Sequence, residues 1–123
     1  MNHAPLTTDR LVLRPVAVGD LPDLTTLWKN EDFTRHIMGR ALSEEEIWFR
    51  LLRDLGHWTA VGYGNWTVRL REGGDYVGSV GVFDYRRDLD PPFDAPELGW
   101  GMAPPFPGRG YAAEALTTVL ERV

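Results

Sequence analysis

The sequence contains 123 residues, of which 43% are hydrophobic, and its formal net charge is −5. This length suits one domain over residues 1–123, and the absence of cysteine excludes disulfide bonds, thiolate nucleophiles and cysteine-bound zinc. The acidic balance disfavours nucleic acid and mildly favours a cationic substrate such as an amine. The sequence also lacks a secretion signal and the roughly 20 apolar residues of a membrane span, so we expect a cytoplasmic protein without a membrane partner.

Apolar periodicity predicts, in chain order, a strand, two helices, a β-hairpin, a further strand and a final helix. Asp20 stands at the N-cap of the first helix, and Ser43 and Glu46 have the spacing of a capping box at the start of the second. Gly73 and Gly74 turn the hairpin. The ranges are 10–16 for the first strand, 19–32 and 43–58 for the helices, 65–72 and 75–87 for the hairpin, 97–102 for the fourth strand and 112 onward for the last helix.

Several apolar and glycine positions predict how these elements pack. Gly78 and Gly81 inside a strand indicate a bulge or the close approach of another backbone. Trp66 and Trp100 occupy strand positions that we expect to face inward. The last helix carries an apolar stripe that runs to the final residue, so we expect the natural protein to continue beyond it. The stripe consists of Ala112, Ala115, Leu116, Val119, Leu120 and Val123.

A glycine loop leads into this last helix within residues 104–116, PPFPGRGYAAEAL. A helix N-terminus presents amides without intrahelical partners, and glycine lets a phosphate approach the backbone, so the loop is compatible with pyrophosphate binding. Taken alone, a bare G-x-G is better explained as a plain turn, because such matches are common by chance. A dinucleotide or P-loop motif is excluded, since Ala113 replaces the third glycine and no G-K-S/T follows.

Isolated polar side chains give weaker signals. Glu97 begins the fourth strand just before the glycine loop, where it is either a general base or a solvated charge. Glu114, in the first turn of the last helix, complements the helix dipole. His3, His36 and His57 lack metal-ligand spacing and are interpreted as surface or linker residues, so we predict no metal site.

Two segments resemble the GNAT superfamily of N-acetyltransferases, and more narrowly its ribosomal-protein N-terminal (Rim) type. Residues 10–28, RLVLRPVAVGDLPDLTTLW, resemble the N-terminal strand and helix of that type, and residues 97–116, ELGWGMAPPFPGRGYAAEAL, are similar to its acetyl-CoA segment. The resemblance implies an α+β, acyl-CoA N-acyltransferase fold with a mixed, mostly antiparallel sheet flanked by helices in the order β-α-α-β-β-β-α. The family's usual C-terminal strand, helix and hairpin are absent, so we expect a truncated form.

The same resemblance implies that acetyl-CoA is a co-substrate. By position, Met102, Ala103 and Pro104 would follow its pantetheine arm. The family's loop usually begins with Gln or Arg, whereas this chain has Pro107, which offers no N–H. Arg109 would also add positive charge at the rim of the pyrophosphate loop. Backbone amides for the phosphates would come from Gly108, Arg109, Gly110, Tyr111 and Ala112.

The implied reaction moves an acetyl group to a primary amine, either a protein N-terminus or a small molecule, by direct attack on the thioester. Glu97 is the candidate base. The N–H of Met102, exposed by a bulge expected around Gly99–Gly101, is the candidate oxyanion donor. The alternative is a GNAT-like module that binds acyl-CoA or a partner without catalysis, supported by Pro107 and by the missing family acid. A homodimer is left open.

Overall fold

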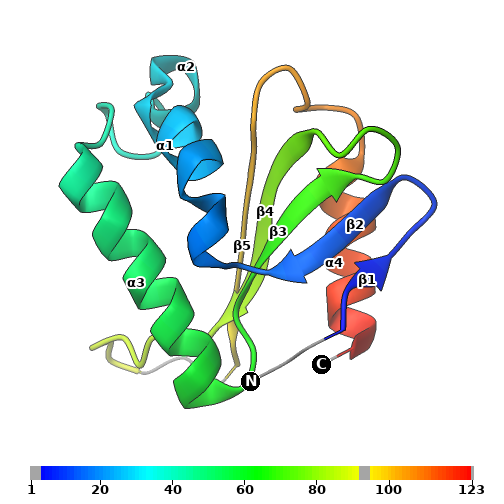
Figure 1. Cartoon of the computed structure of the whole chain (residues 1–123). Helices are drawn as coiled ribbons and strands as arrows, with labels where there is room; N and C mark the ends of the chain where they lie inside the picture. The colour runs from blue at the N-terminus through cyan, green and yellow to red at the C-terminus, as the bar shows by residue number, and fades with distance from the viewer. Residues whose placement is uncertain (1–3, 92–94, 123) are drawn as a thin grey trace.

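A five-stranded sheet forms the centre of the protein, and helices lie on both of its faces (Figure 1). The computed structural model describes residues 4–91 and 95–122. The strands lie in the order β1-β2-β3-β4-β5, and each neighbouring pair is antiparallel. They are β1 (Leu6–Thr7), β2 (Leu11–Pro15), β3 (Asn65–Leu70), β4 (Tyr76–Phe83) and β5 (Glu97–Met102). The helical segments are η1 (Val18–Asp20), α1 (Leu21–Lys29), α2 (Glu31–Thr34), α3 (Glu44–Val61) and α4 (Tyr111–Arg122).

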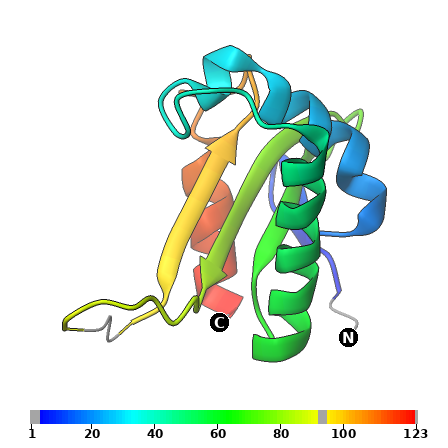
Figure 2. The ribbon, with the colours of Figure 1, turned by 90° about the vertical axis from the view of Figure 1, so that its left-hand side faces the viewer.

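The two faces of the sheet differ in character. Helices α1 and α3 lie on one face and α4 lies on the other (Figures 1 and 2). Because side chains alternate along a strand, Leu13 of β2 faces the same way as its partner Val68 in β3, toward α4. Leu13, Val68 and Val119 of α4 are all fully buried. This side of the sheet is therefore apolar core, whereas the side toward α1 and α3 leaves room for a cavity.

The predicted α+β class and order of main elements are confirmed, and the structure adds three short elements, β1, η1 and α2. Strand β1 precedes the predicted first strand and pairs with β2. The helix expected over 19–32 is divided at Asn30, whose backbone is extended and whose side chain accepts a hydrogen bond from the Phe33 amide at 3.1 Å. Asn30 therefore ends α1 and caps α2. His3 and Val123 lie outside the described residues.

Asp20 has a different role from the one predicted. Its side chain does not cap α1. Instead, its carboxylate accepts hydrogen bonds from the Ala17 amide at 2.9 Å and the Thr67 hydroxyl at 2.7 Å, and Arg69 lies 3.2 Å away. Asp20 thus fastens the start of α1 to β3. The capping box of Ser43 and Glu46 is confirmed at the start of α3.

The outer rim of the sheet on the α4 side exposes apolar side chains. Trp100 was expected to face inward, but 60% of its surface is exposed, whereas Trp66 is buried at 4%. Leu98 of β5 and Leu120 of α4 are each 47% exposed. The reason is that β5 is an edge strand of the described sheet, and α4 leaves this edge uncovered.

Shortening a core side chain tests this description of the core. We expect Leu13→Ala to lower the free energy of unfolding by about 2–5 kcal/mol, because it leaves a cavity between the sheet and α4. Leu52→Ala is the matched control, since Leu52 is 41% exposed on α3, and should change that energy by about 0.5 kcal/mol. Chemical denaturation measures both, and equal losses would contradict the assignment of Leu13 to the core.

Candidate functional site

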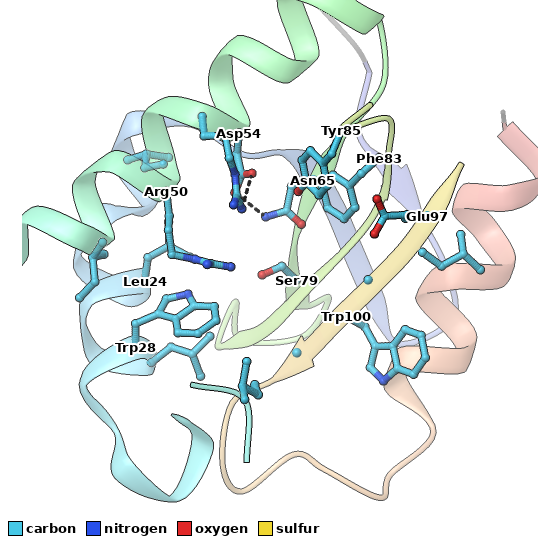
Figure 3. A pocket seen from close by; sticks show the side chains of 18 of the residues that line it. Leu24, Trp28, Arg50, Asp54, Asn65, Ser79, Phe83, Tyr85, Glu97 and Trp100 are labelled. Carbon is cyan, nitrogen blue, oxygen red and sulfur yellow. Dashed lines mark hydrogen bonds and ion pairs between the residues drawn. The ribbon is translucent and has the colours of Figure 1, made fainter. Parts of the chain in front are cut away.

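A cavity of about 340 Å³ opens between α1, α3 and the outer strands of the sheet (Figure 3). Strand β5 presents two residues without side chains to this space, Gly99 and Gly101. A Cβ at Gly101 would lie 2.8 Å from the ring of Phe33, and a Cβ at Gly99 would lie 3.0 Å from the ring of Phe83. The glycines therefore allow aromatic rings to approach the strand and line the cavity.

Glu97 reaches this cavity from the first position of β5, and Figure 3 shows its carboxylate directed into the space. Arg87 Nε donates a hydrogen bond to Glu97 Oε2 at 2.7 Å, and the Glu97 side chain remains 24% exposed. The ion pair therefore fixes the carboxylate at the cavity rim while leaving it accessible. This is a position from which a general base could contact an amine, so the predicted role of Glu97 stays a prediction.

The opposite wall, formed by α3, carries charged residues that were not among the sequence candidates. Arg53 Nη2 lies 3.3 Å from Asp54 Oδ1, and Asn65 Nδ2 donates to Asp54 Oδ2 at 3.2 Å. Burial raises the pKa of Asp54, although the charge of Arg53 opposes this effect. The guanidinium of Arg50 also points into the cavity, 4.1 Å from the ring centroid of Trp28. The helical spacing of these polar residues gave no signal of a cavity, because the cavity forms only when α3 packs across the sheet.

The pairing of β5 decides which of its amides stay free. The Ala103 amide donates to the Val77 carbonyl at 2.8 Å, and the one-to-one register with β4 continues along the whole of β5. Hydrogen-bonded and non-bonded pairs alternate in an antiparallel ladder, so the amide of Met102 points away from β4. Since β5 is the outermost described strand, this N–H faces the open edge of the sheet.

The bulge expected around Gly99–Gly101 is wrong, because β5 pairs residue for residue with β4. The register shift lies in the neighbouring pair, between Val68 and Arg69 of β3. Gly78 of β4 has φ of 152°, and a Cβ there would collide with a carbonyl oxygen of β5. The irregularity and close approach predicted for Gly78 are thus confirmed. The free amide of Met102 follows from its edge position.

The loop between β5 and α4 has an unusual backbone at both of its glycines. Gly108 and Gly110 each have φ of 79°, a left-handed conformation that glycine adopts without strain. Within the described chain, the first amide after Phe106 with a hydrogen-bond acceptor is that of Glu114, which donates to the Gly110 carbonyl at 3.1 Å. The amides of residues 108–113 therefore remain available to a ligand at the positive end of the α4 dipole.

The N-terminal segment of the chain holds this loop in place. Arg10 Nε donates to Glu114 Oε1 at 2.7 Å, and Arg10 Nη1 donates to the Arg109 carbonyl at 3.1 Å. The same guanidinium lies 4.3 Å from the ring centroid of Tyr111. The Thr8 hydroxyl also donates to the Glu114 carboxylate. Glu114, interpreted as a complement to the helix dipole, therefore joins the start of β2 to the start of α4.

The predicted site residues form a line along one strand. Glu97 and Met102 stand at opposite ends of β5, about 16 Å apart along the strand. Ala103 and Pro104 follow Met102, and the loop amides lie beyond them. This spacing suits an elongated ligand whose charged end sits at the α4 N-terminus and whose other end extends along β5 toward the cavity.

His57 has a structural role that contradicts its interpretation as a surface residue. Only 8% of its surface is exposed. The Asp84 amide donates to His57 Nε2 at 2.9 Å, so the ring proton is on Nδ1, which lies 2.7 Å from the Tyr63 carbonyl. The imidazole therefore connects the segment after α3 to the end of β4. No group of acidic, His or Cys residues able to hold a metal ion occurs among residues 4–91 and 95–122.

The antiparallel sheet, the glycine loop and α4 together form an acyl-CoA N-acyltransferase fold. The chain belongs to the acetyltransferase (GNAT) domain family, whose model matches residues 10–123. None of the helices in the described ranges has the length and apolarity needed to cross a membrane.

Solved structures of this family resemble the chain closely. A GNAT-family acetyltransferase from Bordetella pertussis is 32% identical, with a TM-score of 0.85 over 98% of this chain and 72% of that chain. An acetyltransferase from Agrobacterium tumefaciens is 31% identical, with a TM-score of 0.76 over 99% and 66% of the two chains. A ribosomal L7/L12 alpha-N-protein acetyltransferase in complex with coenzyme A is 17% identical, with a TM-score of 0.73 over 94% and 64%, and shares the fold. The chain therefore spans between 64% and 72% of the length of these three relatives.

The anchor between β2 and α4 predicts a pH dependence of stability. Burial, the largest single influence, acts to raise the pKa of Glu114, but the hydrogen bonds from Thr8 and Arg10 together outweigh it and leave the pKa lowered. A carboxyl with a lowered folded-state pKa adds stability above its unfolded pKa of 4.5, and that stability is lost as the pH falls through the folded value. We therefore expect Glu114→Gln to lose less unfolding free energy on acidification below pH 4.5 than the parent chain does.

Chemical denaturation at a series of pH values measures this difference. Glu121→Gln is the matched control, because Glu121 is exposed on the same helix. An acid dependence in Glu114→Gln that equals that of the parent chain would show that the anchor does not stabilise the fold.

Proposed function

We propose that this chain is an acetyl-CoA-dependent N-acetyltransferase that acts on a primary amine. One observation carries the proposal: the amides of residues 108–113 are free at the start of α4, beside the open edge of β5, in a chain of the GNAT family. Helix N-termini with adjacent glycines favour phosphate groups. The complex of a structurally similar acetyltransferase with coenzyme A supports the same choice of co-substrate.

The backbone would bind most of the co-substrate. The pantetheine arm would extend along β5 past Pro104, Ala103 and Met102. Pro107 offers no N–H, so this loop has one donor fewer than the family pattern. The phosphates would accept hydrogen bonds from the amides of Gly108, Arg109, Gly110, Tyr111 and Ala112.

In the proposed reaction, the amine nitrogen attacks the thioester carbon directly. Glu97 accepts the proton that the ammonium group must lose through bridging water, because Glu97 and Met102 stand at opposite ends of β5. The N–H of Met102 donates to the oxyanion that develops as the new C–N bond forms. The C–S bond then breaks, and the thiolate leaves and takes up a proton.

The acceptor in this proposal is either a protein N-terminus, as in the Rim type, or a small-molecule amine. A module that binds acyl-CoA without catalysis is the second candidate. Pro107 favours it, because proline offers no N–H to a phosphate. Binding and turnover are therefore measured separately, on the 123-residue chain and on the product of its whole reading frame.

The loop is tested with a pair of glycine substitutions. Gly108→Ala should weaken acetyl-CoA binding about tenfold or more, because the new side chain strains the loop backbone and crowds the approach of phosphate. Gly74→Ala is the matched control: Gly74 has φ of 80°, Gly108 has 79°, and a Cβ at either position meets nothing within 4 Å. Isothermal titration measures both variants. Equal affinities in the two variants would contradict phosphate binding at the loop.

The base is tested by removing the charge of Glu97. Glu97→Gln should lower kcat by about 10²–10⁴-fold, the range typical of general acid–base groups. Acetyl-CoA affinity should not change, because the loop lies at the other end of β5. Arg87→Gln is the control, since it removes the ion pair but keeps the carboxylate. A full kcat in Glu97→Gln would rule out this assignment.

A further inference from the structure

The charges that line the cavity do not balance. Three arginines and two carboxylates line it in the described chain. Arg53 is paired with Asp54 at 3.3 Å, and Arg87 is paired with Glu97 at 2.7 Å. Arg50 is the cation that remains, so the cavity carries an excess positive charge within a protein whose net charge is −5.

Arg50 is held in the cavity without a carboxylate partner among residues 4–91 and 95–122. Its guanidinium lies over the ring of Trp28, at 4.1 Å, and projects from α3 toward Ser79 on the opposite wall (Figure 3). The side chain is half-buried. Burial, followed by the charge of Arg53, lowers the pKa of Arg50, although the charge of Asp54 opposes this effect. A charge kept in such a place is costly unless something compensates it.

The stacking on Trp28 explains the orientation of Arg50 and leaves its hydrogen-bonding edge free. A guanidinium that stacks on an aromatic face uses its π surface, while its five N–H donors point outward in the plane. None of the described side chains accepts a hydrogen bond from these donors. A planar fork of this kind matches a carboxylate, which it binds through two parallel hydrogen bonds.

We propose that Arg50 binds a carboxylate group carried by the acetyl acceptor, so that the acceptor is an amine with an attached acid. The proposal rests on the proposed acetyltransferase function. Glu97 and Arg50 lie on opposite walls of one cavity, and the bond from Arg87 uses only Oε2 of Glu97. The other carboxylate oxygen can therefore face an ammonium group while Arg50 binds the carboxylate of the same acceptor. The carboxylate has two sources, a small amino acid or an acidic side chain near a peptide N-terminus.

The test compares acids with their neutral amides. The small-molecule arm uses glycine, β-alanine and γ-aminobutyrate, each beside its amide. The peptide arm uses amidated tripeptides with Glu or Gln at the second position. Affinity is measured by isothermal titration in the presence of coenzyme A, and turnover is measured separately by mass spectrometry with acetyl-CoA.

Four chains are compared: the parent, Arg50→Gln, Arg50→Lys and Arg35→Gln. Arg35→Gln removes the same charge at an exposed site, where Arg35 pairs with Asp32 at 2.8 Å and does not line the cavity. Arg50→Gln should weaken binding of the preferred acid about 10- to 100-fold, as expected for a lost hydrogen-bonded charge, and leave its amide unchanged. For each compound, the affinity for the variant is divided by the affinity for the parent chain. The amine of that compound is the same in both measurements, so a difference in basicity between acid and amide does not affect the comparison. Arg50→Lys should restore part of the affinity.

Each outcome decides the proposal. A preference for acids in the parent chain that disappears in Arg50→Gln but persists in Arg35→Gln supports it, and the arm in which it appears identifies the source of the carboxylate. Equal binding of acids and amides by the parent, or an equal loss of both in Arg50→Gln, overturns it. Acid-selective binding without any acetylated product would instead retain the Arg50 site and overturn the proposed catalysis.

Discussion

The close pairing of β4 with β5 is the constraint on which the rest of the site depends. Gly78 of β4 can lie against a β5 carbonyl only because it has no side chain, and this contact allows β5 to run in uninterrupted register with β4. The register then fixes which side chains of β5 face each side of the sheet. Glu97, Gly99 and Gly101 face the cavity, Leu98 and Trp100 face the α4 side, and the amide of Met102 faces the open edge. One steric requirement at a glycine thus places the candidate base, the candidate oxyanion donor and the empty space between them.

A second link fixes the loop relative to this strand. Thr8 and Arg10 hold Glu114, and Arg10 also holds the Arg109 carbonyl, so α4 begins at a defined place beside β2. Arg10 donates its hydrogen bonds to the Glu114 carboxylate and the Arg109 carbonyl, so it orients the glycine loop and leaves the N–H groups of the loop free. The amides stay free while the carbonyl beside them is occupied. A loop of this kind is preorganised for an anion, since its donors need no rearrangement before they bind.

Local patterns in the sequence predicted most of the fold and the part of the candidate site that lies along β5 and the glycine loop. Apolar periodicity identified the hairpin and α3, and the glycines at 108 and 110 indicated a loop compatible with pyrophosphate binding. The patterns failed where a side chain acts across elements. Asp20 has the sequence of a helix cap, yet it binds Thr67 in a distant strand. Arg50 and Asp54 have the spacing of a solvated helix face, and only the packing of α3 over the glycine face of β5 turns that face into a cavity wall.

The net charge of the sequence likewise does not predict the charge of the cavity. An excess of acidic residues favours cationic ligands over the whole surface, but the long-range field is screened within about 8–10 Å at ordinary salt concentrations. The cavity is governed by charges at hydrogen-bond distance instead, and there Arg53 and Arg87 are neutralised by their own partners. Among the described residues that line the cavity, the charged side chain without an ion-pair partner is Arg50, which lies over the ring of Trp28. An acidic surface and a cavity that selects a carboxylate are compatible. The surface charge acts on a ligand that is still outside the protein, whereas Arg50 acts on a ligand that is already in the cavity.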